Sequence, residues 1–296
     1  MRCVAAALLV LAGCATDPRE PELPLPDPLA DAGVFSRSNL VAWCIVPFDA
    51  AKRGPAERAA MLGRLGLQAV AYDYREEHVP SFDDEIAALR QNDIELSAWW
   101  CGGVDPHDPL GGSVGLALET LRRNQASSDL WVAMRDQAFE GLSQPERLAL
   151  AARAIDAIAA EAAKLNCRVG LYNHGGWYGE PENQMAVLDK AQADNVGLVY
   201  NFHHGHEQLD RLNELFPLMA PRLLCVNLNG MTLGGAKIVP LGSGARDSEM
   251  IALIRESGYE GPIGILDHRD ELDAEQSLRE NLEGLAKLVA TFPADE

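Results

Sequence analysis

The chain has 296 residues, of which 47% are apolar, so it can bury the core of one large domain or of two small ones. It carries 44 acidic and 25 basic residues, a formal net charge of -19. A surface this acidic repels nucleic acid and anionic lipid headgroups, so we expect neither as a partner. It also disfavours a polyanionic substrate relative to a neutral sugar.

The first residues have the order of features of an export signal. Arg2 supplies a positive charge, residues 4–12 form an apolar run too short to span a bilayer, and residues 11–14 read Leu-Ala-Gly-Cys. This order resembles a bacterial lipoprotein signal, which is cut before the cysteine. The resemblance implies a signal peptide over residues 1–13 and lipid attachment at Cys14. The protein would then be exported and held on the periplasmic or cell-surface side of a membrane by its acyl chains alone. The alternative is an apolar N-terminus with an incidental cysteine.

A proline-rich acidic segment follows the cysteine. Residues 15–32 contain five prolines and several acids, without apolar periodicity. This composition predicts an extended tether over residues 14–34 and a folded domain over residues 35–296. No later segment has eighteen consecutive apolar residues, so no second membrane span is expected.

From residue 35 onward, short β-rich apolar runs alternate with amphipathic stretches. The expected strands occupy residues 40–46, 69–74, 94–100, 130–134, 168–172, 196–200, 223–228 and 263–266. The expected helices occupy residues 55–65, 81–91, 116–123, 144–165, 182–191, 207–219, 248–256 and 273–290. Eight strand–helix units predict an α/β fold, a single (β/α)8 TIM barrel. A doubly wound open sheet would need a Gly-rich turn after an early strand, but residues 47–50 read Pro-Phe-Asp-Ala.

The cysteines of the domain lie in or beside these apolar strands, without C-x-x-C spacing. They are Cys44, Cys101, Cys167 and Cys225. Export would permit disulfides, but this placement favours small buried core residues.

Polar and aromatic residues gather where the strands end, which is where barrels of this kind form their active sites. Five of the seven histidines fall at these ends. Aromatic faces stack on sugars and polar side chains pair with hydroxyls, so these residues are candidates for binding a small-molecule carbohydrate. The candidate substrate contacts are Asp73, Arg75, Trp99, Trp100, Asn173, Trp177, Asn201, Asn227, Asn229 and His268.

The C-terminal half resembles the xylose-isomerase-like barrel family of sugar and sugar-phosphate isomerases and epimerases. The family has a strand ending in Glu-Asn-His-Gly-Gly, and residues 172–176 here read Tyr-Asn-His-Gly-Gly. Its Asp-x-x-His corresponds to Asn-Phe-His-His at 201–204, and its Leu-Gly-x-Gly-x-x-Asp turn to residues 241–247. Its Gly-Tyr-x-Gly corresponds to residues 258–261.

The departures concern the metal. Members of the family hold a divalent metal through Glu, Asp, His and Glu at these strand ends. The corresponding residues here are Tyr172, Asn201, Asn227 and Leu266, or Asp267 if the register shifts by one. Hard divalent ions are held largely by carboxylate oxygens, so the metal site of the family is largely replaced.

Three alternatives follow. In the first, the protein is a sugar isomerase or epimerase, or a sugar lyase, that transfers a proton beside a carbonyl. His174, His204 and Asp267 are its candidate catalytic residues, with Lys237 or Arg75 stabilising an oxyanion. His204 and His206 are candidate ligands of Mn, Zn or Mg in that enzyme. Adjacent residues of a strand point to opposite faces, so one of His203 and His204 is expected to face away from the site. The second alternative is a lipoprotein that binds carbohydrate without catalysis, and the third is an inactive site.

Overall fold

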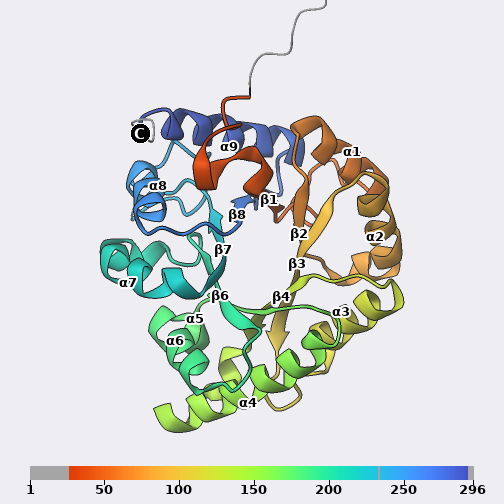
Figure 1. Cartoon of the computed structure of the whole chain (residues 1–296), viewed down its shortest axis with the longest axis vertical. Helices are drawn as coiled ribbons and strands as arrows, with labels where there is room; N and C mark the ends of the chain where they lie inside the picture. The colour runs from red at the N-terminus through yellow and green to blue at the C-terminus, as the bar shows by residue number, and fades with distance from the viewer. Residues whose placement is uncertain (1–26, 233, 293–296) are drawn as a thin grey trace, which may run out of the picture.

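The computed structural model of the chain describes residues 27–232 and 234–292, and it forms a closed barrel of parallel strands surrounded by helices (Figure 1). The strands are β1 (Leu40–Trp43), β2 (Ala69–Tyr72), β3 (Glu95–Val104), β4 (Asp129–Met134), β5 (Val169–Tyr172), β6 (Val196–Asn201), β7 (Leu223–Leu228) and β8 (Ile263–Leu266). They are paired in sequence order, and β8 closes the barrel by pairing with β1. The prediction of a single (β/α)8 TIM barrel is therefore confirmed.

Helices follow every strand and cover the outside of the barrel. They are α1 (Pro55–Leu65), α2 (Phe82–Gln91), α3 (Gly112–Arg123), α4 (Gln144–Ala163), α5 (Gly176–Gly179), α6 (Pro181–Lys190), α7 (Leu212–Met219), α8 (Asp247–Glu256) and α9 (Ala274–Val289). Their starts follow local chemistry. Pro55 opens α1, and the Asp273 side chain accepts the backbone N–H of Glu275 at the start of α9. Within the described residues, none of these helices has the length and apolar character needed to cross a bilayer.

The folded domain begins before residue 35. The Leu29 side chain is fully buried, and the Asp27 carboxylate accepts a hydrogen bond from the Arg37 guanidinium at 2.7 Å. The last part of the expected tether, from residue 27 onward, therefore packs on the barrel. The expected signal peptide and Cys14 lie outside the described residues.

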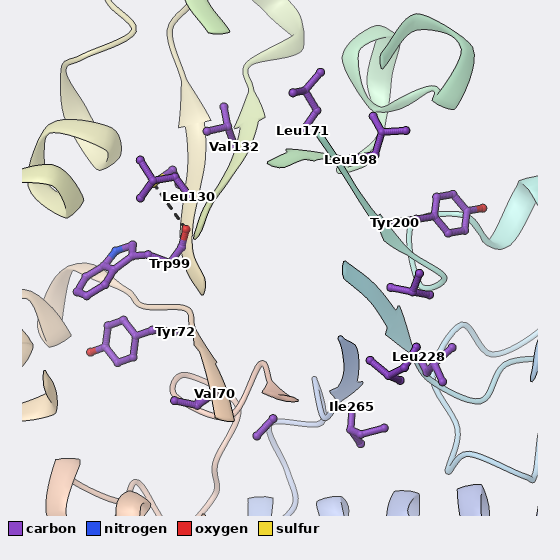
Figure 2. Packing of buried hydrophobic residues seen from close by; sticks show 14 of the residues in the cluster. Val70, Tyr72, Trp99, Leu130, Val132, Leu171, Leu198, Tyr200, Leu228 and Ile265 are labelled. Carbon is purple, nitrogen blue, oxygen red and sulfur yellow. Dashed lines mark hydrogen bonds between the residues drawn. The ribbon is translucent and has the colours of Figure 1, made fainter. Parts of the chain in front are cut away.

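The apolar core has two layers, because successive side chains of a strand point to opposite faces. The outer layer lies between strands and helices. Figure 2 shows its members, among them Tyr72, Trp99 and Tyr200, pointing away from the barrel axis. The inner layer fills the barrel itself. All four cysteines of the domain are buried and free, which confirms their expected burial.

Aromatic rings fill the barrel interior near the C-terminal ends of the strands. Trp131 contacts Trp43 with ring centroids 4.9 Å apart, and Trp100 contacts Tyr172 at 4.6 Å. Trp43 and Tyr172 are 6.0 Å apart. We call these four residues the aromatic plug, and they form the base on which the site is built.

Candidate functional site

A small pocket lies over the aromatic plug, at the C-terminal end of the strands. Its residues come from β1, β2, β3, β5, β6 and β8 or from the segments that follow them. We call it the central pocket, lined by Trp43, Cys44, Phe48, Asp73, Arg75, Trp100, Tyr172, His174, Asn201, His204 and His268. Its volume is ≈ 50 Å³, well below the roughly 300–1,000 Å³ of ordinary ligand pockets. A sugar can enter only if side chains at its rim move.

Seven of the residues singled out from the sequence line this pocket. They are Asp73, Arg75, Trp100, His174, Asn201, His204 and His268. They come from five different strand ends, and barrel closure alone brings them together.

Four imidazoles form a continuous chain beside the pocket. The ring of His204 lies 4.4 Å from that of His174 and 4.6 Å from that of His203, and His203 lies 5.0 Å from His268. His204 lines the central pocket and His203 does not, in line with the expectation that one of the two faces away from the site. β6 ends at Asn201, whose side-chain oxygen accepts the His203 N–H while its backbone carbonyl accepts the His204 N–H. The chain turns there, so strand alternation no longer applies.

These histidines are held neutral. Burial lowers the pKa of His204 to about 2, with a further lowering from His174, His203 and His268. Burial likewise lowers the pKa of His203 to about 4. Burial also lowers the pKa of His174 and of His268. Neutral imidazoles can donate a hydrogen bond to a carbonyl oxygen without carrying charge into the pocket.

Asp73 is the carboxyl group of the pocket. It is 2% exposed, and neither of its oxygens has a hydrogen-bond partner among the described residues. Burial raises the pKa of Asp73 to about 7, outweighing the opposing effects of Arg75 and of the Val46 backbone. A carboxyl group with a pKa near neutrality can take up and release a proton at physiological pH.

The positions that correspond to the metal ligands of the family are packed against one another. The Tyr172 hydroxyl accepts hydrogen bonds from the Trp43 indole at 3.2 Å and from the Asn201 side chain. The Asn227 side chain is buried toward Gly264, where any Cβ would collide with its amide oxygen. Leu266 belongs to the inner apolar layer.

These residues do not fit a divalent metal. Tyrosine, two amides and leucine supply no carboxylate, and the hydroxyl and one amide are already engaged with each other. Within residues 27–232 and 234–292, no group of three or more His, Cys, Asp or Glu side chains is arranged to hold a metal ion.

The tryptophan predictions need correction. Trp99 is 0% exposed and lies in the outer layer, with its ring 4.8 Å from that of Phe82 (Figure 2). It therefore packs between β3 and α2, while Trp100 faces the pocket. Trp177 is held outside the pocket, because its indole donates to Gln144 at 2.7 Å and its ring contacts Phe139.

Three of the asparagine side chains expected to contact substrate are instead buried within the barrel, namely Asn173, Asn227 and Asn229. Asn173 is buried and pairs with the Asn201 backbone, accepting its N–H at 2.7 Å and donating to its carbonyl at 3.1 Å. Asn229 donates to the carbonyls of Gly230 and Lys237, and so fixes the segment after β7. None of Asn173, Asn227 and Asn229 lines the central pocket.

His206, Lys237 and Asp267 also lie outside the pocket lining. His206 contacts the Thr232 carbonyl at 2.9 Å, so it is not paired with His204 as a metal ligand. Lys237 is exposed on the segment between β7 and α8. Asp267 is fully buried and accepts a hydrogen bond from the Ser277 hydroxyl, and burial raises its pKa to about 8.

Three pocket residues, Trp43, Cys44 and Phe48, were not among the site residues expected from the sequence. Phe48 stacks on His268 with centroids 3.9 Å apart, and Cys44 lies beside Asp73 at the end of β1. Both Cys44 and His268 have left-handed backbone conformations, with φ of 58° and 52°. Such conformations cost of the order of 1–3 kcal/mol each and cluster at functional sites.

Known structures of similar shape support the fold. 3-keto-D-glucoside 4-epimerase from E. coli has a TM-score of 0.62 and 15% identity, covering 86% of this chain and 99% of that one. The IOLI protein with a binding zinc atom has a TM-score of 0.66 and 13% identity, covering 87% and 100%. L-ribulose 3-epimerase has a TM-score of 0.64 and 13% identity, covering 86% and 95%.

At these identities the likeness concerns the fold alone. Among curated proteins, none matches the chain. Residues 61–288 match the family described as xylose isomerase-like TIM barrel. The chain therefore belongs to the xylose isomerase-like TIM barrel family.

Proposed function

We propose that the protein is a sugar isomerase or epimerase that transfers a proton beside a carbonyl without a bound metal. The observation that carries the proposal is Asp73, a buried carboxyl group with a pKa of about 7 that lines the central pocket. Arg75 and the Val46 backbone favour the charged form of Asp73, but burial outweighs both, so the carboxyl group keeps its proton up to about neutral pH.

The chemistry needs a base, an acid and a polarising group. The Asp73 carboxylate takes the proton from the carbon next to the substrate carbonyl. His174 or His204, each neutral, donates a hydrogen bond to the carbonyl oxygen as it gains negative charge, and the exposed Arg75 adds positive charge at the rim. Return of the proton to the neighbouring carbon, together with transfer of the proton of the neighbouring hydroxyl to the former carbonyl oxygen, gives isomerisation. Return of the proton from Asp73 to the opposite face of the same carbon, after the intermediate has turned in the pocket, gives epimerisation.

The experiment is proton exchange in deuterated water. Aldoses and ketoses are incubated with the protein, and incorporation of deuterium beside the carbonyl is followed by NMR. Asp73→Asn should abolish incorporation, and His204→Gln should reduce it about tenfold or more. Asp84→Asn is the matched control, because Asp84 is exposed on α2 and should leave exchange unchanged. Wild-type exchange that survives in Asp73→Asn would refute the assigned base.

A second candidate function is carbohydrate binding without catalysis. It is favoured by the aromatic faces of Phe48 and Trp100, which line the pocket from β1 and β3. In that case a sugar would quench tryptophan fluorescence, Trp100→Phe would reduce the quenching, and no deuterium would be incorporated.

We also propose that the protein is exported and membrane-anchored through Cys14. The support is the Leu-Ala-Gly-Cys sequence after a charged and apolar start. Mass spectrometry of the N-terminus should find acylated Cys14, and Cys14→Ser should move the protein from the membrane to the soluble fraction. An unmodified N-terminus that includes residues 1–13 would contradict this.

A further inference from the structure

A second and larger cavity lies beside the central pocket on the same face of the barrel. Its volume is ≈ 680 Å³, within the range of ligand sites. It is lined by residues between Val46 and Pro55, by Arg58, by residues between Glu77 and Ser81, and by Asp270. We call it the outer cavity.

The two cavities are built on the same three segments. Phe48 lines the central pocket, and its neighbours Pro47 and Asp49 line the outer cavity. In the same way, Arg75 precedes Glu77 by two residues, and His268 precedes Asp270 by two. The guanidinium of Arg75 lies 5.3 Å from the Phe48 ring, which in turn stacks on His268. These three side chains line the central pocket on the segments that the two cavities share.

The outer cavity does not suit an anion. Asp49, Glu77 and Asp270 line it, and the start of α1 is already occupied, because the Glu57 carboxylate accepts the Gly54 N–H at 3.1 Å. Two of its cations are also neutralised. Arg53 pairs with Asp49 and Asp273, each at 2.8 Å, and Arg58 pairs with Glu85.

The cavity does suit a neutral molecule rich in hydroxyls. Lys52, Glu77 and Asp270 form no ion pair with any described residue, so they offer a free donor and two free acceptors. Below them, Arg58 is 3% exposed and its Nε has no partner in the part of the chain that the structure describes. Each sugar hydroxyl both donates and accepts, so one hexose unit can satisfy this mixed set.

We infer that the substrate is a glycoside of at least two sugar units, with the reacting unit in the central pocket and the second unit in the outer cavity. This rests on the proposed function. The outer cavity has room for a sugar unit as it stands, whereas the central pocket admits the reacting unit only when side chains at its rim move. Displacement of the Arg75 side chain from Phe48 would widen the central pocket toward the outer cavity.

The test compares reducing disaccharides with a monosaccharide. Deuterium incorporation at the reducing unit is measured for lactose, maltose and cellobiose and for glucose, with the full-length protein. At least one disaccharide should have a kcat/KM about tenfold or more above that of glucose. Glu77→Ala combined with Asp270→Ala should lower the ratio of the two values about tenfold, through KM, because two hydrogen bonds to charged groups are lost. Glu119→Ala combined with Glu283→Ala is the control of equal charge, since both residues are exposed outside the two cavities and should leave the ratio unchanged.

The outcomes separate the inference from the proposed function. Exchange on glucose that equals exchange on every disaccharide, or a ratio unaffected by the double variant, overturns the inference and leaves the function intact. If no sugar exchanges deuterium, the proposed function fails. Tryptophan fluorescence titration with the same sugars then tests whether the two cavities bind two sugar units. Tighter binding of a disaccharide that the double variant weakens would support two subsites, and binding of none of them would overturn the inference as well.

Discussion

The Trp43 indole N–H donates a hydrogen bond to the Tyr172 hydroxyl oxygen at 3.2 Å, linking the ends of β1 and β5 across the inside of the barrel. The Asn201 side chain donates to the same oxygen from β6. Two of the positions that hold metal in the family are thereby turned into part of the packed interior. The reacting groups of the site then have to come from elsewhere, and Asp73 is the one acid among the described residues that line the pocket.

Removing the Tyr172 hydroxyl tests this packing. Tyr172→Phe leaves two buried donors without an acceptor, so the free energy of unfolding should fall by about 1–3 kcal/mol, measured in urea at pH 7. Tyr178→Phe is the matched control, because Tyr178 is equally buried but its hydroxyl has no partner among the described residues. Equal losses in the two variants would mean that the bonds to Tyr172 contribute nothing.

The Asp73 carboxyl predicts a dependence of stability on pH. Its pKa rises from 3.8 to about 7 on folding, so the native state holds a proton that the unfolded state has released. Stability should therefore fall as pH rises from about 4 to about 7, by up to about 4 kcal/mol, since each pKa unit is worth about 1.4 kcal/mol. Asp73→Asn should remove this fall and be more stable than wild type at pH 8, in urea unfolding at pH 5 and pH 8. Asp267 acts in the same direction but is present in both proteins, so it cancels in the comparison. A variant that is less stable than wild type by the same amount at both pH values would mean that the carboxylate is paired.

The buried ion pair of Arg58 and Glu85 joins α1 to α2 beneath the outer cavity. Glu85→Ala leaves a buried guanidinium without its partner and should lower the free energy of unfolding by about 3–5 kcal/mol. Replacing both residues, as Arg58→Met and Glu85→Leu, should restore most of the loss. The exposed pair of Arg123 and Asp83 provides the control, and Asp83→Ala should cost little. No recovery in the double variant would show that Arg58 is needed for another reason.

Metal analysis addresses the replaced ligands directly. After incubation with Mn, Zn and Mg and removal of the excess, elemental analysis should find no stoichiometric metal, and EDTA should not change the rate of deuterium exchange, because Tyr172, Asn201 and Leu266 supply no carboxylate. One bound equivalent that is lost in His204→Ala and kept in His206→Gln would contradict this, and would mean that the imidazole chain rearranges around an ion.

The layout of the barrel was predictable because each helix and strand has its own apolar periodicity and is bounded by residues that start or end such elements. The expected strand 223–228 and the expected helix 55–65 coincide with β7 and α1, whose ends are marked by a change from apolar to polar residues and by Pro55. The polar strand ends were also predictable as the place of the site. The order of strands around a closed barrel then brings the ends together without further information.

Side-chain direction was not predictable at the same level. Trp99 and Trp100 are adjacent and both aromatic, so the sequence does not tell which one faces inward. The register of β3 against β2 shifts between Val70 and Ala71, just before these two residues. The acidity of Asp73 depends on burial by Cys44 and Phe48, which come from another strand end. The outer cavity is lined by segments more than 180 residues apart, those around Glu77 and Asp270. A local sequence pattern therefore cannot predict that the cavity exists.

The fit between Asn227 and Gly264 limits how this barrel can change over time. Any side chain at 264 would collide with the amide of residue 227, so the two positions are not free to vary one at a time. A histidine at 227, as in the family, would have to enter the same space beside Cys225 and β8. A metal-binding residue at 227 therefore needs compensating substitutions among the residues that pack against it.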